Sequence, residues 1–402
     1  MDSNFILTSG EQTKAIHGGE APDPVTKASS PNLVMSTTFV TDADAGFSVE
    51  GMDENQSWLY TRWGNPTIHQ LEEKLALLEG AETAVAFASG MGAIVALLFH
   101  LLKAGDHAII SDVAYAALSE ITNEKIPELG IEISKVNTSD LEAVENALRP
   151  NTRLVYIETP CNPLLRLTDI AAVARITHKA GAFLAVDSTF ATPAATKPIE
   201  LGADFVVHSL TKYLGGHGDA LGGVLLGQKE LLAPLRKKTA IRLGGVISPF
   251  NAWLILRGLA TFPLRMRVHE ENALAVAARL EKHHKVKQVI YPGLPSHPQY
   301  ELARRQMKNF SGIITFRVEN GKEQAQRFVE KLQIIHYAVS LGHHRSLIFY
   351  LNTKDLLETS FKFSTPEQFH SWKAFAGEGI FRLSVGLEDA ADLINDLEQA
   401  LA

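Results

Sequence analysis

Cysteine is almost absent from this 402-residue chain, whose single cysteine is Cys161. One cysteine cannot form an intrachain disulfide, so a fold held together by disulfide bonds is excluded. A chain without disulfides suits a reducing compartment, and we expect a cytoplasmic protein. The first residues, Met1–Asn4, lack the basic and apolar pattern of a secretory signal, which leads to the same expectation.

Long apolar runs are also missing. The longest extends from Ala93 to Leu102 and is interrupted by His100. A membrane-spanning helix needs about 20 predominantly apolar residues, so we expect no membrane segment.

Charge of either sign is not in large excess. The chain has 38 Lys and Arg against 45 Asp and Glu, a formal net charge of −7. Nothing in this balance attracts nucleic acid or an anionic membrane, and we expect neither as a partner. The composition is 46% hydrophobic and 21% charged, which is typical of a globular protein.

The chain divides into three regions by pattern. Residues 1–63 contain few periodic runs and are interpreted as an N-terminal arm that reaches over another surface. Residues 64–264 alternate short apolar runs with helical stretches, and residues 265–402 change to a smaller α+β pattern. The regular part begins with a helix that starts at Pro66 and stops at Gly80.

The alternation predicts an α/β fold with a mostly parallel sheet covered by helices. The strands expected in the larger domain are 84–88, 107–111, 131–136, 154–157, 183–186 and 205–208. One expected helix, 140–148, follows Ser139 as its N-cap. In the C-terminal domain we expect a long helix over 269–283 and strands over 286–290, 313–318, 336–339 and 381–385.

Residues whose side chains can take part in catalysis or ligand binding follow the ends of these strands. In parallel sheets the carboxyl ends of the strands form the ligand-binding edge. The stretches that follow the expected strands are Ser89–Ala93, Glu158–Pro163, Asp187–Thr189 and His208–Tyr213. Together they offer a lysine, a carboxylate, hydroxyl groups and a glycine-containing helix start.

Pyridoxal phosphate needs that combination. Lys212 can bind its aldehyde covalently, and Asp187 can face the ring nitrogen and keep it protonated. A helix start at Gly90–Met91, with the hydroxyls of Ser209 and Thr211, can hold the phosphate.

The sequence resembles the Cys/Met-metabolism family of fold-type-I pyridoxal-phosphate enzymes. The motifs that carry the resemblance run in family order: Tyr60–Thr67, Ser89–Met91, Glu158–Pro163, Val186–Thr189, His208–Tyr213 and Arg382–Asp389. Within the family, Tyr291–Pro298 and Ser248–Trp253 resemble the methionine γ-lyases. The resemblance implies a large cofactor-binding domain and a smaller C-terminal domain.

The resemblance also implies roles for single residues. Lys212 is similar to the cofactor-binding lysine that moves protons between substrate carbons, and Asp187 to the partner of the ring nitrogen. Tyr115 is similar to the tyrosine that stacks on the cofactor ring and protonates the leaving group. The remaining implied cofactor contacts are Gly90, Met91, Asn162, Ser209 and Thr211, and the implied anchor of the substrate carboxylate is Ser340 with Arg382.

Tyr60 and Arg62 resemble residues that reach the phosphate held by a neighbouring subunit. The resemblance therefore implies a homodimer as the active unit, paired into a homotetramer.

The chain departs from the family pattern mainly around the substrate. Methionine γ-lyases carry a cysteine in the place of Ala117 and a Lys-Asp pair in the place of Ala240–Ile241. The run 343–352 differs from the usual family sequence. Val339 stands where cystathionine-processing members have a glutamate, which favours a substrate without a distal ammonium group.

Three hypotheses of function follow. The first is α,γ-elimination from methionine or a related sulfur amino acid, which yields a thiol, ammonia and 2-oxobutanoate. The second is a cystathionine γ-synthase or γ-lyase, or a γ-replacement transferase that adds a thiol to an acylated homoserine. The third is a degenerate, non-enzymatic binding protein, against which Lys212, Asp187, Tyr115 and Arg382 argue.

Other reactive residue types receive simpler interpretations. The pairs His283–His284 and His343–His344 lack a third ligand at a useful spacing, so we expect no metal site. Cys161 is interpreted as a small buried residue rather than a reactive thiol.

Overall fold

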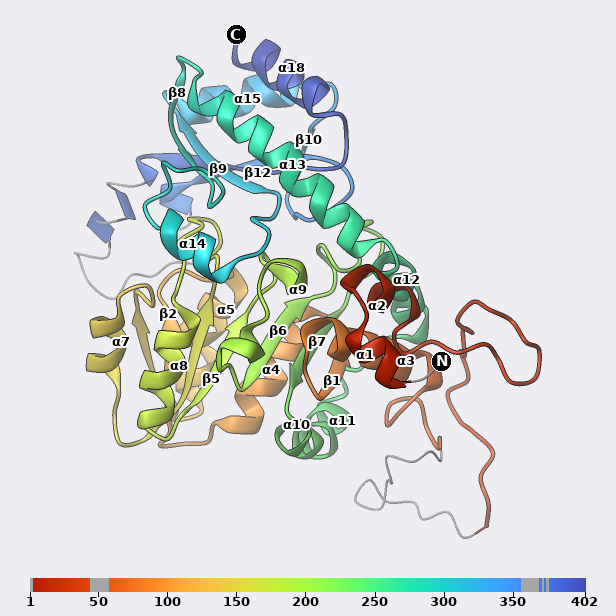
Figure 1. Ribbon diagram of the computed structural model, residues 1–402. Helices are drawn as coiled ribbons and strands as arrows, with labels where there is room; N and C mark the ends of the chain where they lie inside the picture. The colour runs from red at the N-terminus through yellow and green to blue at the C-terminus, as the bar shows by residue number, and fades with distance from the viewer. Residues whose placement is uncertain (1–2, 44–57, 356–368, 371, 374–375) are drawn as a thin grey trace. The chain divides into compact units, whose positions relative to one another are not determined.

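The chain folds into two units, each built from two stretches of sequence. A computed structural model describes residues 3–43, 58–355, 369–370, 372–373 and 376–402 (Figure 1). The first unit comprises residues 1–101 and 204–263, and the second comprises 102–203 and 264–402. The expected domain limits, 1–63, 64–264 and 265–402, stay a prediction.

Three antiparallel strands form the sheet of the first unit. They are β1 (Thr83–Phe87), β7 (Gly223–Gly227) and β6 (Phe205–Ser209), with β7 in the middle. The sequence did not indicate β7, because it lies behind a glycine-rich turn and itself begins and ends with glycine. The strand expected over 84–88 corresponds to β1. It pairs antiparallel with β7 and so departs from the expected parallel pattern.

The helices of the first unit begin and end largely where the sequence places their signals. In α3 (Pro66–Glu79) the side chain of Asn65 accepts hydrogen bonds from the N–H groups of Thr67 and Ile68. Gly80 ends the helix in a left-handed conformation, with φ of 77°. The other helices are α4 (Gly90–Leu101), α10 (Lys229–Leu235), the π-helical η2 (Arg236–Ala240), α11 (Ile241–Leu243) and α12 (Pro249–Leu259).

The N-terminal arm is more regular than expected. It contains α1 (Ser3–Thr8) and α2 (Glu11–His17), which the irregular composition did not indicate. The buried ammonium group of Lys74 in α3 donates to the carboxylate of Glu20 and to the carbonyl of Ile16 at 3.2 Å. These contacts fasten α2 to α3, because a buried ammonium group must keep its partners.

Four parallel strands form the first sheet of the second unit, as the alternating pattern predicts. Their spatial order is β5 (Phe183–Asp187), β4 (Thr152–Glu158), β2 (His107–Ser111) and β3 (Glu132–Val136). The connecting elements are α5 (Ala116–Asn123), α6 (Lys125–Glu128), α7 (Leu141–Ala147), α8 (Ile170–Lys179), α9 (Thr192–Ala195) and η1 (Pro198–Leu201). Figure 1 shows α8 beside β5. The helix α7 packs against β3.

One helix cap differs from the expectation. Asp140, rather than Ser139, caps α7, and its carboxylate accepts from the N–H groups of Glu142 and Ala143. The hydroxyl of Ser139 instead donates to the side chain of Asn137 at 2.7 Å. Both residue types are good N-caps, so the sequence alone could not choose between neighbours.

The C-terminal part of the second unit contains a five-stranded sheet. Its order is β10 (His336–Tyr337), β11 (Leu347–Asn352), β12 (Gly379–Ser384), β9 (Ile313–Val318) and β8 (Val286–Ile290). Only β10 and β11 pair in parallel. The helices with described bounds in this part are α13 (Phe262–Glu281), α14 (Tyr300–Gln306), α15 (Gly321–Lys331) and α18 (Ala390–Leu401). The sequence did not indicate β11, which coincides with the unusual run 343–352.

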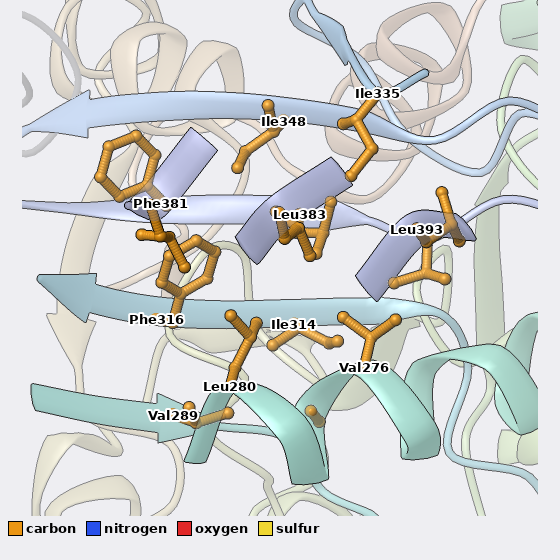
Figure 2. Packing of buried hydrophobic residues seen from close by; sticks show 14 of the residues in the cluster. Val276, Leu280, Val289, Ile314, Phe316, Ile335, Ile348, Phe381, Leu383 and Leu393 are labelled. Atoms are coloured by element: carbon orange, nitrogen blue, oxygen red, sulfur yellow. The ribbon is translucent and has the colours of Figure 1, made fainter. Parts of the chain in front are cut away.

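Apolar side chains from α13, β9, β12 and α18 pack into one core of the second unit, as Figure 2 shows. The ring of Phe381 stacks on Phe316 at 5.3 Å between centroids and meets Phe328 edge-on at 4.9 Å. Full burial of such side chains contributes roughly 1.5–3 kcal/mol each. This core holds β12, the strand that carries Arg382, in a fixed register with β9 and β11.

Among the helices that the structure describes, none combines the length and the apolar character needed to cross a membrane.

Candidate active site

The candidate residues lie in both units. Tyr60, Arg62, Gly90, Met91, Ser209, Thr211 and Lys212 belong to the first unit. Tyr115, Asn162, Asp187, Ser340 and Arg382 belong to the second. We describe the geometry of each group within its own unit.

In the first unit, the start of α4 lies against the end of β6. A Cβ added to Gly90 would lie 3.1 Å from the Cβ of Ser209, so glycine permits the close approach of these two segments. The side chain and carbonyl of Ser89 accept from the N–H groups of Gly92 and Ala93. Helical bonding does not use the N–H groups of Gly90 and Met91, and a helix start of this kind binds anions.

Lys212 follows β6 in a tight turn. Its backbone N–H donates to the carbonyl of Ser209 at 3.2 Å, which keeps the lysine close to the end of the strand. The hydroxyl of Thr211 accepts from the N–H of Gly222 at 3.1 Å and donates to its carbonyl at 3.3 Å. The structure therefore brings Gly90, Ser209 and Lys212 together at one end of the antiparallel sheet.

Tyr60 and Arg62 lie together on the first unit. The guanidinium of Arg62 stands over the ring of Tyr60, 5.5 Å from its centroid, and donates to the carbonyl of Ile241 at 2.8 Å. Both side chains are exposed, and Tyr60 exposes 42% of its surface. Their role toward a neighbouring subunit stays a prediction.

In the second unit, Asp187 ends β5 as a buried carboxylate. It accepts from the hydroxyl of Tyr156 at 3.1 Å and from the N–H of Thr189 at 3.0 Å. Burial, followed by the charge of Asp187, raises the pKa of Tyr156 well above its usual value, so its phenol stays a donor. Sequence reasoning missed Tyr156, because a tyrosine inside an apolar strand looks like a core residue.

Glu158 ends the neighbouring strand β4, directly opposite Asp187. One carboxylate oxygen accepts from the N–H of Tyr115 and the other from the N–H of Asn162, each at 2.7 Å. Burial and the charge of Asp187 raise the pKa of Glu158, and the two N–H donors oppose that rise. Although the motif contained Glu158, its sequence gave no indication of this double contact.

Arg382 on β12 is held by two of the predicted residues. Its guanidinium donates to the side-chain oxygen of Asn162 and to the carbonyl of Ser340, both at 3.0 Å. Ser340 adopts a left-handed backbone conformation with φ of 84°, which is costly for a residue with a side chain. The hydroxyl of Ser340 also lies 3.2 Å from Nε2 of His343.

The side chain of Cys161 is buried and packs with Val113, Leu164 and Ile380. Burial raises the pKa of its thiol to about 11, so the thiol stays protonated at neutral pH. The interpretation as a small buried residue agrees with this environment.

Both groups of residues fit pyridoxal phosphate. In the first unit, a lysine lies beside a glycine-lined helix start, which suits an aldehyde and a phosphate on one molecule. In the second unit, Asp187 is buried and accepts hydrogen bonds from Tyr156 and Thr189, and a carboxylate in such a place suits a protonated pyridine nitrogen. The backbone N–H of Tyr115 and the guanidinium of Arg382 belong to the same network as Glu158 and Asn162, and the side chain of Tyr115 is exposed.

Comparisons with known proteins agree with these observations. The family described as "Cys/Met metabolism PLP-dependent enzyme" matches residues 12–402. A canavanine gamma-lyase of Pseudomonas canavaninivorans is 42% identical over 100% of this chain and 98% of its own length. An L-methionine gamma-lyase of Porphyromonas gingivalis is 41% identical over 100% of this chain and 99% of its own.

Proteins with other named activities are also similar to this chain. An O-succinylhomoserine sulfhydrylase of Pseudomonas aeruginosa is 41% identical over 97% of this chain and 94% of its own length. The crystal structure of a cystathionine gamma-lyase from Lactobacillus plantarum, complexed with L-serine, is 35% identical with a TM-score of 0.87 over 98% of both chains. The expected α/β, fold-type-I architecture and the expected cofactor are thereby confirmed. The chain belongs to the Cys/Met-metabolism family of pyridoxal-phosphate-dependent enzymes.

Proposed function

We propose that this enzyme catalyses α,γ-elimination on methionine or a related γ-substituted sulfur amino acid. With methionine, one water enters and methanethiol, ammonia and 2-oxobutanoate leave. The cofactor supplies the electron sink that makes the α-proton and then a β-proton acidic. The substrate is an amino acid, in agreement with the family.

The residues of this chain supply the proton transfers. In this proposal, Nζ of Lys212 removes the α-proton and then a β-proton from the substrate. The phenol oxygen of Tyr115 protonates the departing sulfur, and Asp187 holds the proton on the ring nitrogen.

Arg382 is proposed to bind the substrate carboxylate. Its guanidinium is already oriented by Asn162 and Ser340, and a planar guanidinium can grip a carboxylate with two hydrogen bonds. Because the carboxylate is common to all amino acids, this contact orients the substrate without selecting its side chain.

Val339 is the observation that carries the preference for an uncharged side chain. It exposes 63% of its surface and directly precedes Ser340. By resemblance, a glutamate at this position suits a substrate with a distal ammonium group. A valine offers that ammonium no partner, which forgoes roughly 1.5–3 kcal/mol of charge-assisted hydrogen bonding. Methionine, whose side chain ends in a neutral thioether, loses nothing.

A panel of single amino acids tests the reaction. We expect methionine and homocysteine to release 2-oxobutanoate and a thiol without an added nucleophile, measured as oxo acid and free thiol. The variant Val339→Glu should shift kcat/KM toward cystathionine relative to methionine by about 10-fold or more, since it restores a partner for the ammonium.

Val329→Glu is the matched control, because Val329 in α15 is equally exposed at 61% and has no proposed role in the site. This control variant should leave the ratio of kcat/KM for cystathionine to kcat/KM for methionine unchanged. If methionine and homocysteine yield no oxo acid, while an acylated homoserine with added sulfide yields a new amino acid, the elimination proposal is wrong.

That outcome would favour the second candidate, γ-replacement. Two observations support keeping it: the similarity to an O-succinylhomoserine sulfhydrylase, and the unusual run 343–352 next to the proposed carboxylate anchor.

A further inference from the structure

We propose that Glu158 is a positioning residue of this enzyme, which sets the places of Tyr115 and Asn162 through their backbone N–H groups. The inference rests on the proposed roles of Tyr115 and of the Arg382 anchor.

The first argument is that the two carboxylate oxygens of Glu158 serve different segments of the chain. Each carboxylate oxygen accepts one 2.7 Å hydrogen bond, one from Tyr115 and the other from Asn162. Tyr115 precedes α5 and Asn162 follows β4, so these donors lie 47 positions apart in sequence. The side chain of Glu158 therefore links the two segments at these N–H groups, in addition to the apolar packing of Val113 with Cys161 nearby.

The second argument is the continuation of the network beyond Asn162. The side-chain oxygen of Asn162 accepts from Arg382, whose other nitrogen donates to the carbonyl of Ser340. A displacement of the Asn162 backbone would therefore move the guanidinium that is proposed to bind the substrate carboxylate. Glu158 thus influences the proposed proton donor on one side and the carboxylate anchor on the other.

The third argument is the choice of residue type. Glu158 is only 5% exposed and lies beside another buried carboxylate, Asp187, which is an unfavourable place for a second negative charge. Glutamine would fill the same space without a charge. Only one of its two terminal atoms can accept a hydrogen bond, however, so one of the two N–H groups would lose its partner. A carboxylate is the side-chain group of this size that can accept from both.

The test compares Glu158→Gln with a matched control, Asp396→Asn. Asp396 is another buried carboxylate of the second unit, and it accepts from the N–H groups of Gln333, Ile334 and Ile335. Both variants replace a buried carboxylate that serves backbone donors with an amide. The control differs in that its donors belong to none of the candidate residues.

Two probes separate the carboxylate contact from general binding. Glycine carries a carboxylate and an amine, while methylamine carries the amine alone, and both are titrated into holoenzyme by visible absorbance. We expect Glu158→Gln to weaken glycine binding by roughly 10- to 100-fold, since charge-assisted hydrogen bonds are disturbed. Methylamine binding should change by less than about twofold, and Asp396→Asn should change neither probe.

Thermal unfolding of the cofactor-free chains supplies the structural baseline. If both variants lower the midpoint but glycine binding stays at the wild-type value in Glu158→Gln, Glu158 is merely structural and the proposal is wrong. If Glu158→Gln does not fold, Glu158→Asp repeats the comparison, because it keeps the charge and withdraws both oxygens by one methylene. Because glycine has no γ-substituent, this readout does not depend on which reaction the enzyme catalyses.

Discussion

At the scale of single residues, the candidate site depends on buried charges that have specific partners. Asp187 receives hydrogen bonds from Tyr156 and Thr189, and Glu158 receives them from Tyr115 and Asn162. A buried carboxylate without donors would take up a proton and lose its charge. At the ends of β4 and β5, where the two acidic side chains lie opposite each other, the donors to Glu158 oppose the rise in its pKa that burial and the charge of Asp187 cause.

Lys212 is the residue whose chemical modification tests the cofactor site most directly. Reduction of the holoenzyme with borohydride should fix the cofactor on the peptide that contains Lys212, as measured by mass spectrometry. Lys212→Ala should abolish the visible absorbance of covalently bound cofactor, because no amine then remains at that place.

Lys229→Ala is the matched control, since Lys229 is an exposed lysine of the same unit at the start of α10. It should bind cofactor like the wild type. Recovery of the reduced cofactor on any lysine other than Lys212 would refute this assignment.

At the scale of elements, His107 joins three strands of the parallel sheet. It is fully buried in β2, with Nδ1 2.8 Å from the hydroxyl of Thr152 in β4 and Nε2 2.9 Å from that of Ser134 in β3. Burial, with a smaller contribution from Arg149, lowers the pKa of His107 to about 4. The imidazole is therefore neutral in the folded chain at pH 7.

This pKa predicts a dependence of stability on pH. Between pH 6.5 and 4 the unfolded chain binds a proton at His107 that the folded chain does not bind. The free energy of unfolding therefore falls as the pH falls through this range, by at most about 1.4 kcal/mol per pH unit from this residue. His107→Gln removes the contribution, so its stability deficit relative to wild type should shrink between pH 6.5 and 4.5, as measured by denaturant unfolding.

Leu154→Ala provides the comparison, because Leu154 is buried in β4 of the same sheet and its side chain has no ionisable group. The difference in the free energy of unfolding between this variant and the wild type should stay constant with pH. If the loss of unfolding free energy in His107→Gln is equally constant with pH, His107 takes up its proton at the same pH in the folded and the unfolded chain.

At the scale of the whole molecule, the candidate residues are divided between two units, and the resemblance extends the site to a second subunit. Arg62 is exposed, and its guanidinium donates a hydrogen bond to the carbonyl of Ile241 in the same unit. We propose that in the dimer it reaches the phosphate held by the other chain. The oligomeric state itself stays a prediction.

Complementation between two inactive variants tests this proposal. Arg62→Ala should weaken cofactor retention by roughly 10-fold or more, because a charge-assisted contact to phosphate is lost. When Arg62→Ala and Lys212→Ala chains are refolded together, mixed dimers should regain activity. One of their two sites then combines an intact Lys212 with an intact Arg62 from the partner.

Each variant refolded alone is the control and should stay weakly active or inactive. Absence of rescue in mixtures that form dimers by light scattering would place Arg62 and Lys212 of one site on the same chain.

Much of the fold and cofactor site follows from the sequence by itself. The helix start at Pro66, its end at Gly80 and the parallel strands of the second unit were predicted, because capping residues and apolar runs act over a few neighbouring positions. Lys212 and Asp187 were predicted because each lies near the carboxyl end of an expected strand, and their roles stay predictions. Where local signals were weak or duplicated, the prediction failed, as with β7, β11 and the cap of α7.

Only the tertiary structure decided which side chains support the site. Glu158 reaches Tyr115 across 43 positions, and Arg382 reaches Asn162 across 220. Tyr156 looks like a core residue in the sequence, yet its hydroxyl donates to Asp187. Hydrogen bonds act over about 3 Å in space, whereas the sequence records only distance along the chain, so such partners become visible when strands and loops are brought together.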